Sequence, residues 1–271
     1  MNPHDSSRKS SQFTTVILAG GLGTRLSEET ITKPKPMVEI GGRPILWHIM
    51  RHYATYGHSR FLLALGFKAE YIKAFFCGYK TANADFFVNL KSGETRFLSA
   101  SADDADWDVG LIDTGAKTQT GGRVKRLQEL VGRNAFFMTY GDGVSNVDLN
   151  ELLSFHRAHG KLATLTAVRP AARFGDLTLE GNLVTSFREK NQISEGWVNG
   201  GFFVLEPGVF DYIAGDDTTF EREPMERLAA DGQLVAYKHD GFWQPMDTIR
   251  EVRLLNEMWE RGDAPWTMPK R

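Results

Sequence analysis

Segments with strand-like and helix-like patterns alternate along the first part of this chain. Short apolar runs that predict strands occupy residues 14–20, 60–66, 107–115 and 134–143. Segments with apolar residues at helical spacing follow them, at residues 44–57, 68–80, 121–132 and 148–160. This alternation, with nearly continuous apolar strands, is typical of a mostly parallel sheet that carries helices on both faces. We therefore predict a Rossmann-like α/β fold, with Asp148 as the N-cap of the fourth helix.

The pattern changes in the second part of the chain, where polar and apolar residues alternate with a period of two. This alternation predicts a strand over residues 162–170 and a hairpin over residues 176–190. Further strands are expected within residues 197–213 and 233–243, and helices at residues 221–232 and 248–262. Because no linker, repeat or low-complexity tract separates the two parts, we predict that residues 13–271 form a single domain around one mixed sheet. Residues 1–12 are predicted to be a disordered tail.

Charge and cysteine content narrow the class of protein. The 271 residues carry a net charge of -2, which gives no general attraction to nucleic acid or to an anionic membrane. Cys77 is the single cysteine, the residues before Phe13 lack the apolar stretch of a signal peptide, and no apolar run approaches the roughly 18 residues of a membrane span. We expect a cytoplasmic protein that binds neither nucleic acid nor membrane. Any anion site must then be a local cluster of basic residues.

Three polar stretches fall where the predicted strands end, which is where ligands of such sheets bind. They are residues 20–35, the sequence YGDG at 140–143 and the sequence WQPMDT at 243–248. Glycines in the first stretch permit positive φ and close approach of backbone N–H groups to an anion. This stretch lacks the third glycine of a dinucleotide fingerprint, and the P-loop sequence is absent. An anion-binding loop and an ordinary strand-to-helix turn both remain open at this point.

Two lysines follow the glycine loop in the sequence Lys-Pro-Lys-Pro. Pro34 and Pro36 restrict the backbone and favour an extended segment, so that the side chains of Lys33 and Lys35 point in different directions. One lysine can therefore face the glycine loop while the other faces solvent. The alternative is a rigid surface loop with two solvated lysines.

The glycine loop and the lysines together carry a family resemblance. The sequence LAGGLGTRL, followed at short distance by KPKPM, resembles the signature of sugar-1-phosphate nucleotidylyltransferases, which join a sugar phosphate to a nucleoside triphosphate and release pyrophosphate. The similarity extends over nearly the whole chain, through LIDTGAKTQTGGRVKRLQ, TYGDGVSNVDL, FREK, WVNGGFFVLEP and GFWQPMDTIRE. The segments DTG, TGGR and WVNGGFFVLEP point to the cytidylyl-transferring branch of this family.

The resemblance implies substrates, a cofactor and partners. It implies transfer of a cytidylyl group from CTP to α-D-glucose 1-phosphate, with CDP-glucose and pyrophosphate as products and Mg²⁺ as cofactor. It also implies a homo-oligomer and a place in the synthesis of surface polysaccharide such as O antigen. A thymidylyl- or uridylyltransferase and a catalytically silent sugar-nucleotide-binding protein remain as alternatives. A metal-dependent glycosyltransferase is disfavoured, because YGDG has one aspartate where such enzymes commonly carry Asp-x-Asp.

Residues that match the family motifs are expected to form the site. The resemblance implies a nucleotide-binding loop of Leu18, Ala19, Gly20, Gly21, Leu22, Gly23 and Thr24. It makes Arg25 and Lys35 the catalytic pair on the triphosphate, with Lys35 at the α-phosphate. It assigns further contacts with the nucleotide, mainly with the base, to Thr118, Gly121, Gly122, Arg123, Gly141 and Asp142. Contacts with the sugar and its phosphate are implied for Glu189, Lys190, Asn199, Gly200, Gly201 and Trp243.

Two aspartates match the metal-binding positions of the family, Asp142 in YGDG and Asp247 in WQPMDT. Mg²⁺ prefers oxygen ligands, commonly one or two carboxylates with phosphates and water. Each aspartate also has a structural interpretation. Asp142 lies between two glycines, where aspartate is common in a turn, and Asp247 precedes Thr248 at an expected helix start, where it could serve as the cap.

The residues assigned to the base and the sugar have structural alternatives as well. Arg123 could donate to O2 or N3 of cytosine, while carbonyl groups near Gly121 and Gly122 accept from N4. Alternatively, the two glycines start a helix and Arg123 is solvated. Trp243 is expected either beside the sugar or in the core.

The chemistry of nucleotidyl transfer agrees with this set of residues. A sugar 1-phosphate is mostly ionised at neutral pH, because the second pKa of a phosphomonoester is about 6, so its attacking oxygen needs no general base. The reaction requires two polyanions held in line and neutralisation of charge on the α-phosphate and the leaving pyrophosphate. Lysine, arginine, Mg²⁺ and backbone N–H groups meet this requirement. The loops correspondingly show no Ser-His-Asp or Cys-His arrangement.

Overall fold

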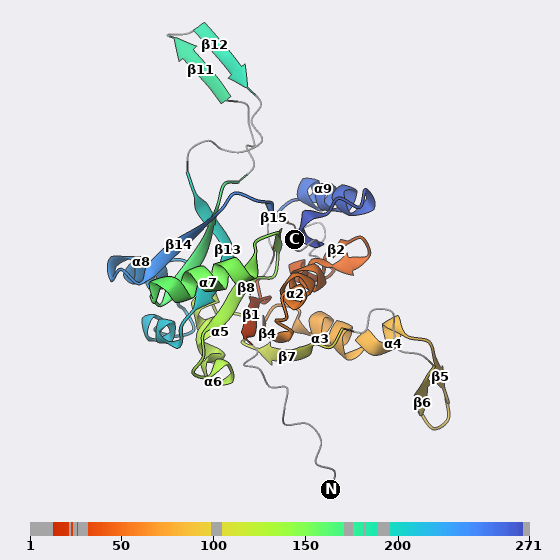
Figure 1. Cartoon of the computed structure of the whole chain (residues 1–271). Coiled ribbons are helices and arrows are strands. Elements are labelled where there is room, and N and C mark those ends of the chain that lie inside the picture. Colours follow the sequence, from red (N-terminus) through yellow and green to blue (C-terminus); the bar gives the residue numbers. More distant parts are fainter. Residues whose placement is uncertain are drawn as a thin grey trace.

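A seven-stranded sheet forms the centre of the protein (Figure 1). The structure is a computed structural model and describes residues 13–21, 23, 26, 32–98, 105–170, 176–180, 183–188 and 196–267. From one edge to the other, the strand order is β14-β10-β13-β8-β1-β4-β7. These strands are β1 (Thr14–Leu18), β4 (Arg60–Leu65), β7 (Asp108–Asp113), β8 (Phe136–Tyr140), β10 (Ala163–Val168), β13 (Val198–Leu205) and β14 (Leu234–His239).

The strands from the first part of the chain run parallel. β1 pairs in parallel with β4 and β8, so that Leu18 lies opposite Ala64 on one side and Tyr140 on the other, and β4 pairs in parallel with β7. β13 runs antiparallel to its neighbours β8 and β10, whereas β10 and β14 are parallel. The sheet is mostly parallel, which confirms the predicted Rossmann-like α/β fold. The second part of the chain continues the same sheet, as expected.

Helices cover both faces of the sheet, as the alternating pattern predicted (Figure 1). Successive β1 side chains enter opposite cores, with Ile17 on one face and Val16 and Leu18 on the other. The helices are α2 (Ile45–Thr55), α3 (Ala69–Cys77), α4 (Tyr79–Asn83), α5 (Thr120–Arg126), α6 (Gln128–Val131), α7 (Leu149–His159), α8 (Glu223–Ala230) and α9 (Ile249–Glu260), with 3-10 helices η2 (Lys35–Met37), η3 (Pro207–Tyr212) and η4 (Pro265–Thr267). Asp148 caps α7, as predicted. In the described part of the chain, none of the helices is long and apolar enough to cross a membrane.

Pairs of short strands lie outside the central sheet. They are β2 (Glu39–Ile40) with β3 (Arg43–Pro44), β5 (Phe86–Val88) with β6 (Thr95–Phe97), β9 (Gly143–Ser145) with β15 (Trp243–Pro245), and β11 (Asp176–Glu180) with β12 (Leu183–Arg188). The β11–β12 pair confirms the predicted hairpin. The β5–β6 hairpin extends from the body beyond α4 (Figure 1), and its apolar side chains are largely exposed, so it adds little to either core.

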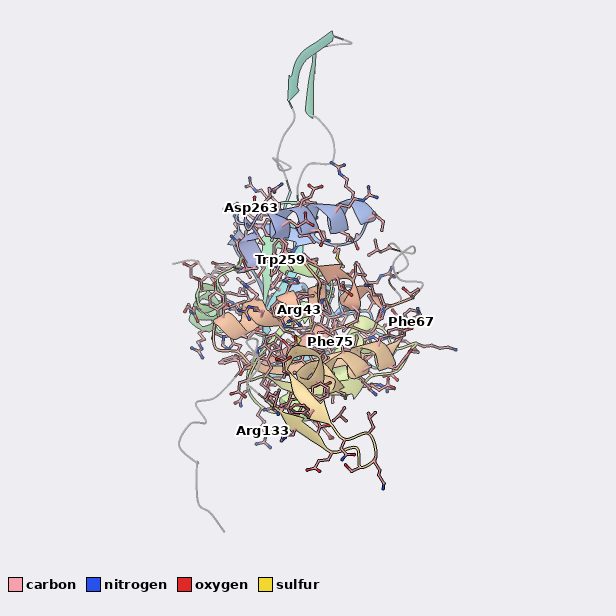
Figure 2. All side chains as sticks on the ribbon, turned by 90° about the vertical axis from the view of Figure 1, so that its right-hand side faces the viewer. Arg43, Phe67, Phe75, Arg133, Trp259 and Asp263 are labelled. Carbon is pink, nitrogen blue, oxygen red and sulfur yellow. The ribbon has the colours of Figure 1, made fainter. Side chains whose placement is uncertain are left out.

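The helix α9 is tied to an early part of the fold. Trp259 of α9 contacts the ring of His48 in α2, with the ring centroids 4.8 Å apart. The backbone N–H of Gly41, in the turn between β2 and β3, donates to Asn256 Oδ1 of α9 (2.9 Å). Figure 2 shows this side of the molecule, with Trp259 above Arg43 of β3. These contacts fix the position of α9 and hence of its N-terminus, which is part of the site described below.

Buried histidines make the stability of this fold depend on pH. Burial lowers the pKa of His48, His52 and His58 from 6.5 to about 4, so these side chains are neutral in the folded protein near pH 7. Between pH 6.5 and 4, the unfolded chain binds protons that the folded protein does not bind, and the free energy of unfolding falls as the pH falls. The loss approaches about 3 kcal/mol per histidine at the lower end of this window. We expect the midpoint of urea denaturation to decrease progressively as the pH is lowered from about 7 to about 5.

His58 provides a variant that tests this explanation. Its Nε2 atom is buried and has no hydrogen-bond partner among the described residues, and its ring packs against Phe13 and Phe137. His58→Phe removes one titrating group and one unpaired polar atom from this aromatic cluster. The denaturation midpoint of the variant should therefore depend less on pH than that of the parent. Identical pH dependence in the two proteins would contradict the role assigned to His58.

Candidate active site

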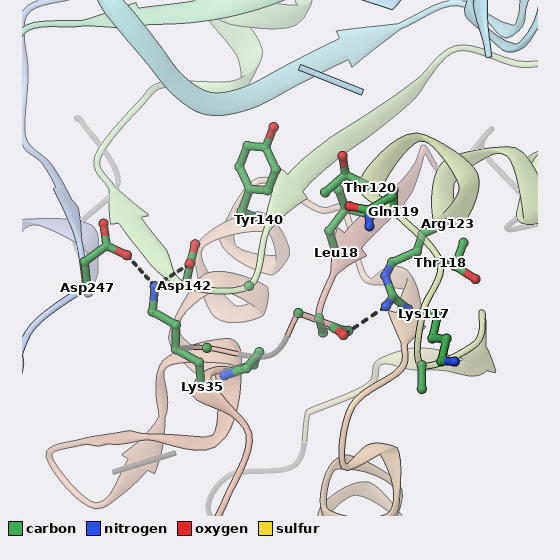
Figure 3. A pocket seen from close by; sticks show the side chains of 17 residues that line it. Leu18, Lys35, Lys117, Thr118, Gln119, Thr120, Arg123, Tyr140, Asp142 and Asp247 are labelled. Carbon is green, nitrogen blue, oxygen red and sulfur yellow. Dashed lines mark hydrogen bonds and ion pairs between the residues drawn. The ribbon is translucent and has the colours of Figure 1, made fainter. Parts of the chain in front are cut away.

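A cavity of about 790 Å³ lies at the carboxyl ends of β1 and β8, the edge at which ligands of such sheets bind (Figure 3). The backbone N–H of Gly141 donates to Leu18 O (3.0 Å) and joins the two strand ends. Every described residue of the predicted nucleotide loop lines this cavity, namely Leu18, Ala19, Gly20, Gly21 and Gly23. The cavity also contains the predicted residues Lys35, Thr118, Arg123, Gly141, Asp142 and Asp247.

One lysine and two aspartates form a charged cluster in this cavity. Lys35 Nζ lies 2.6 Å from Asp142 Oδ2 and 2.7 Å from Asp247 Oδ1 (Figure 3). Lys35 is buried, whereas both aspartates are partly exposed. Burial alone would lower the pKa of Lys35, but the two carboxylates outweigh burial and hold that pKa above its usual value, so the amine stays charged. The structure therefore brings together the predicted catalytic lysine and both predicted metal-binding aspartates.

The sequence Lys-Pro-Lys-Pro explains the direction of Lys35. Pro34 precedes the 3-10 helix η2, which starts at Lys35 and contains Pro36. This tight turn directs Lys35 into the cavity. Lys33 does not line the cavity, and its Nζ instead pairs with Glu39 Oε1 (3.2 Å). The two lysines thus have different environments, as predicted, but the expected extended segment is wrong, because residues Lys35–Met37 form a 3-10 helix.

Backbone pairing holds the two aspartates next to each other. Asp142 lies in the turn between β8 and β9, and Asp247 follows β15, which pairs antiparallel with β9. The backbone N–H of Met246 also donates to Asp142 O (2.9 Å). Asp142 therefore lies in a turn, which agrees with its structural interpretation. The same turn directs its carboxylate toward Lys35.

Thr248, not Asp247, caps helix α9. The Thr248 side chain accepts a hydrogen bond from Glu251 N, and the Glu251 carboxylate accepts one from Thr248 N (2.8 Å) in return, which forms a capping box. Glu251 Oε2 also accepts from Asp247 N (2.6 Å). The interpretation of Asp247 as the helix cap is therefore wrong. The cap fixes the Asp247 backbone, and the Asp247 carboxylate is directed at Lys35.

The arrangement of Asp142 and Asp247 suits a hard divalent cation. One oxygen of each carboxylate contacts the ammonium of Lys35, so the two carboxylates can bind the same positively charged group. Mg²⁺ usually takes one or two protein carboxylates and completes its coordination with water and substrate phosphates. In the part of the chain that the structure describes, no group of three or more His, Cys, Asp or Glu side chains could hold a metal. The donor set therefore fits a metal that is bound jointly by the two aspartates and phosphate.

A second, smaller cavity adjoins the first and contains predicted sugar-binding residues. It is lined by Asn199, Gly200, Gly201 and Trp243, which are all the predicted residues of this group that the structure describes. Tyr140 and Asp142 line both cavities. These two side chains therefore stand at the boundary between the larger and the smaller cavity.

Local contacts shape the smaller cavity. The indole Nε1 of Trp243 donates to Gly200 O (2.7 Å), and the side chain lines the cavity while it also packs against the core. Its contact with the sugar stays a prediction. Gly201 has φ of +80°, and a Cβ atom there would lie 2.6 Å from Tyr140 Cδ2. Only glycine fits this conformation against the tyrosine ring.

Arg123 is buried, and its guanidinium binds protein oxygens. Nη1 donates to Leu65 O (2.8 Å) and Thr114 Oγ1 (2.7 Å), and Nη2 donates to Gly20 O (3.0 Å). Arg123 thereby holds the glycine loop against the ends of β4 and β7. The alternative that places Arg123 in solvent is wrong, because only 4% of its surface is exposed. A contact between Arg123 and a base stays a prediction. A base that binds Arg123 would contact a guanidinium that already donates hydrogen bonds to three protein oxygens.

Gly121 and Gly122 lie in the first turn of helix α5, which starts at Thr120. The backbone N–H of Gly121 donates to Thr218 O (2.8 Å). A Cβ atom on Gly122 would lie 2.5 Å from Asp216 Cα. Close packing of residues 215–219 thus accounts for both glycines, in agreement with their structural interpretation. Their predicted part in base recognition remains a prediction.

A tyrosine that lines both cavities, Tyr140, and its hydrogen-bond partner Glu221 were not among the site residues predicted from the sequence. Tyr140 OH and Thr120 Oγ1 both donate to the carboxylate of Glu221, the latter at 2.6 Å. Burial, together with the charge of Glu221, raises the pKa of Tyr140, so its hydroxyl remains a donor. Lys117 and Gln119 also line the larger cavity. Tyr140 lies two residues before the predicted metal ligand Asp142, and this position could have identified it as a site residue. Glu221 lies 81 residues after Tyr140, and no feature of the sequence relates it to the site.

Some predicted site residues lie outside the part of the chain that the structure describes. They are Leu22, Thr24, Arg25, Glu189 and Lys190. Their roles at the triphosphate and at the sugar phosphate remain predictions from the family resemblance.

Comparisons with known proteins agree with this geometry. The family model described as nucleotidyl transferase matches residues 14–248. Glucose-1-phosphate cytidylyltransferase from Salmonella typhi is 51% identical over 252 residues, which cover 93% of this chain and 97% of that protein. The probable glucose-1-phosphate cytidylyltransferase from Bacillus subtilis is 43% identical over 252 residues, with 93% and 98% covered. The crystal structure of HddC from Yersinia pseudotuberculosis is 23% identical, has a TM-score of 0.67, covers 91% of this chain and 99% of that chain, and supports the fold alone.

Proposed function

Because this chain belongs to the nucleotidyl transferase family, and within it to the glucose-1-phosphate cytidylyltransferases, we propose that it transfers a cytidylyl group from CTP to α-D-glucose 1-phosphate. The products are CDP-glucose and pyrophosphate. The nucleotide occupies the larger cavity, which contains the glycine loop, and the sugar phosphate occupies the smaller one.

The junction of the two cavities is the observation that carries this proposal. Asp142 lines both cavities, and the ammonium of Lys35 lies 2.6 Å from its carboxylate. A reaction that joins two phosphates requires positive charge at the point where they meet. Here a buried, charged lysine lines the larger cavity beside the glycine loop, and it pairs with Asp142, which lines both cavities.

The residues of this chain act by binding, orienting and neutralising. Lys35 neutralises charge that develops on the α-phosphate during in-line attack by the sugar phosphate. Asp142 and Asp247 hold Mg²⁺, which supplies further neutralisation of phosphate oxygens when it is bound. The sugar phosphate attacks in its ionised form, so no side chain has to remove a proton. Arg123 fixes the glycine loop through Gly20 O.

The proposal extends to the setting in which the enzyme works. It includes a homo-oligomer and the use of CDP-glucose for surface polysaccharide, which rest on the family resemblance, and a cytoplasmic location, which rests on the sequence features described above. The net charge of -2 supports the expectation that neither nucleic acid nor a membrane surface is a partner.

The choice of base tests the proposal directly. Cytosine presents an amino donor at N4, whereas uracil and thymine present an acceptor at O4, so a site that matches one pattern opposes the other. Mispaired buried polar groups cost about 1–3 kcal/mol each, so one or two of them predict a preference of roughly ten- to a thousandfold. With glucose 1-phosphate and Mg²⁺, kcat/KM measured by pyrophosphate release should be higher for CTP than for UTP, dTTP, ATP or GTP by about this factor.

The nucleotide panel also separates the alternatives. If UTP or dTTP equals CTP in kcat/KM, the cytidylyl assignment fails while nucleotidyl transfer stands. If no nucleoside triphosphate is consumed although CTP binds in equilibrium dialysis, the chain is the sugar-nucleotide-binding protein instead.

A further inference from the structure

The ammonium of Lys35 occupies the point at which a metal would meet the two aspartates. Its Nζ lies 2.6 Å from Asp142 Oδ2 and 2.7 Å from Asp247 Oδ1. Both contacts are charge-assisted hydrogen bonds at short distance, and the lysine side chain is only 9% exposed. The lysine that acts on phosphate and the carboxylates that hold the metal are therefore partners of each other.

Lysine and a metal cannot use the same two oxygens at once. Mg²⁺ binds carboxylate oxygens at about 2.0–2.1 Å, so an ion on Asp142 Oδ2 and Asp247 Oδ1 would press directly against the ammonium. The net charge of the cluster also opposes simultaneous binding of the lysine and the metal. Lys35 cancels one of the two negative charges of the aspartates, and a divalent ion added to this group would leave it with excess positive charge in a partly buried place.

The backbone around the cluster is fixed, so an exchange would move the lysine side chain alone. Pro34 and Pro36 restrict the backbone on either side of Lys35, whose carbonyl accepts from Val38 N (3.0 Å). Asp142 is held through its carbonyl by Met246 N, as described above. The backbone at Lys35 and at Asp142 thus stays in place, and the exchange requires side-chain movement only.

A nucleoside triphosphate supplies what this exchange requires. Lys35 lines the larger cavity together with the glycine loop, where the proposed function places the triphosphate. Phosphate oxygens offer the ammonium new anionic partners and bring the negative charge that a lysine and a divalent ion need in order to share the site.

We propose that Lys35 competes with the metal ion for Asp142 and Asp247, so that the metal binds tightly only together with the nucleotide, whose phosphates accept Lys35. This inference rests on the proposed function for the location of the triphosphate. Lys35 then has two roles, as a counter-ion of the aspartates before the nucleotide binds and as a ligand of phosphate afterwards.

Direct titration with Mn²⁺ tests the competition without any measurement of turnover. Mn²⁺ is a paramagnetic substitute for Mg²⁺, and its free concentration is read from its electron paramagnetic resonance signal. In the absence of nucleotide, Lys35→Met and Lys35→Gln should bind Mn²⁺ at least about tenfold more tightly than the parent, because the ammonium that competes for the two carboxylates is gone. Lys33→Met is the matched control, since Lys33 pairs with Glu39 outside the cavity, and it should bind Mn²⁺ as the parent does.

The nucleotide provides the second half of the experiment. Addition of CTP without sugar phosphate should raise the Mn²⁺ affinity of the parent by at least about tenfold, after correction for Mn²⁺ held by CTP alone, and should raise that of the Lys35 variants by less. Equal Mn²⁺ affinity of the parent and of both folded Lys35 variants without nucleotide overturns the inference. If circular dichroism shows that the Lys35 variants are unfolded, the parent alone decides. The inference is then overturned if the parent binds Mn²⁺ as tightly without CTP as with it.

Failure of the inference can be told apart from failure of the proposed function. Turnover of CTP and glucose 1-phosphate is measured separately on the parent. Turnover with equal Mn²⁺ affinities contradicts the competition alone. Tighter Mn²⁺ binding by the Lys35 variants without any turnover of the parent supports the competition and contradicts the proposed function.

Discussion

Replacement of Lys35 by alanine is expected to lower kcat by about 10²–10³-fold, a loss comparable to removal of one oxyanion-hole donor. The reason is the position of its ammonium in the larger cavity, between Asp247 and Asp142, the latter of which lines both cavities. In the proposed mechanism this charge acts on the α-phosphate in the transition state, so kcat should fall more than KM rises. The measurement is steady-state pyrophosphate release with saturating CTP, glucose 1-phosphate and Mg²⁺.

Lys33→Ala is the control for this prediction. Lys33 lies two residues away and pairs with Glu39 outside the cavity, so its loss should change kcat much less. Thermal unfolding of both variants checks that each is folded. Comparable kcat of Lys35→Ala and the parent would exclude Lys35 from catalysis.

Replacement of Asp142 or Asp247 by asparagine is expected to lower kcat by a similar factor of about 10²–10³ at millimolar Mg²⁺, and to raise the Mg²⁺ concentration that gives half-maximal activity. An amide keeps the shape of the carboxylate but lacks the charge that offsets dehydration of a hard cation. Titration of kcat against Mg²⁺ measures both effects. Excess EDTA should abolish turnover of the parent.

Asp148→Asn provides a matched control for the metal prediction. Asp148 caps α7 by accepting from Asn150 N and Glu151 N, and it does not line either cavity. Asparagine is also a good N-cap, so this variant should keep the parent's dependence on Mg²⁺. Undiminished activity of the parent in excess EDTA would show that the two aspartates serve the structure and not a metal.

The helix and strand pattern predicted most of the fold, but not the direction of every strand. Periodicity identifies a strand and its buried faces, and the alternation with helices correctly indicated a mostly parallel sheet. The antiparallel direction of β13, between β8 and β10, depends on how the chain returns to the sheet after the β11–β12 hairpin. Strands of only three residues, such as β5, β6, β9 and β15, offer too short a pattern to be recognised.

The competing interpretations of Asp247 show where sequence could have decided more. Asp and Thr are both favoured at a helix N-cap, and Asp247 and Thr248 are adjacent. Thr248 is followed three residues later by Glu251, which is the pattern of a capping box and correctly predicts Thr248 as the cap. The capping-box pattern alone would therefore have excluded the interpretation of Asp247 as the helix cap.

Contacts between distant segments could not be predicted in this way. The hydrogen bonds of Arg123 with Gly20 and Leu65, and that of Tyr140 with Glu221, join parts of the chain that no local pattern relates. Family resemblance identified Lys35, Asp142 and Asp247 as site residues, but not that the lysine binds both carboxylates.

The three residues of the charged cluster, Lys35, Asp142 and Asp247, are added to the growing chain at widely different times during translation. Lys35 is separated from Asp142 by 107 residues and from Asp247 by 212 residues. At a synthesis rate of about 5–20 residues per second, roughly 10–40 s pass between the addition of Lys35 and that of its second carboxylate. During this interval the nascent chain contains an amine that its final surroundings will bury, without the full set of charges that compensates for burial. The charged cluster is therefore completed late in translation, and chains that terminate before Asp247 cannot form it.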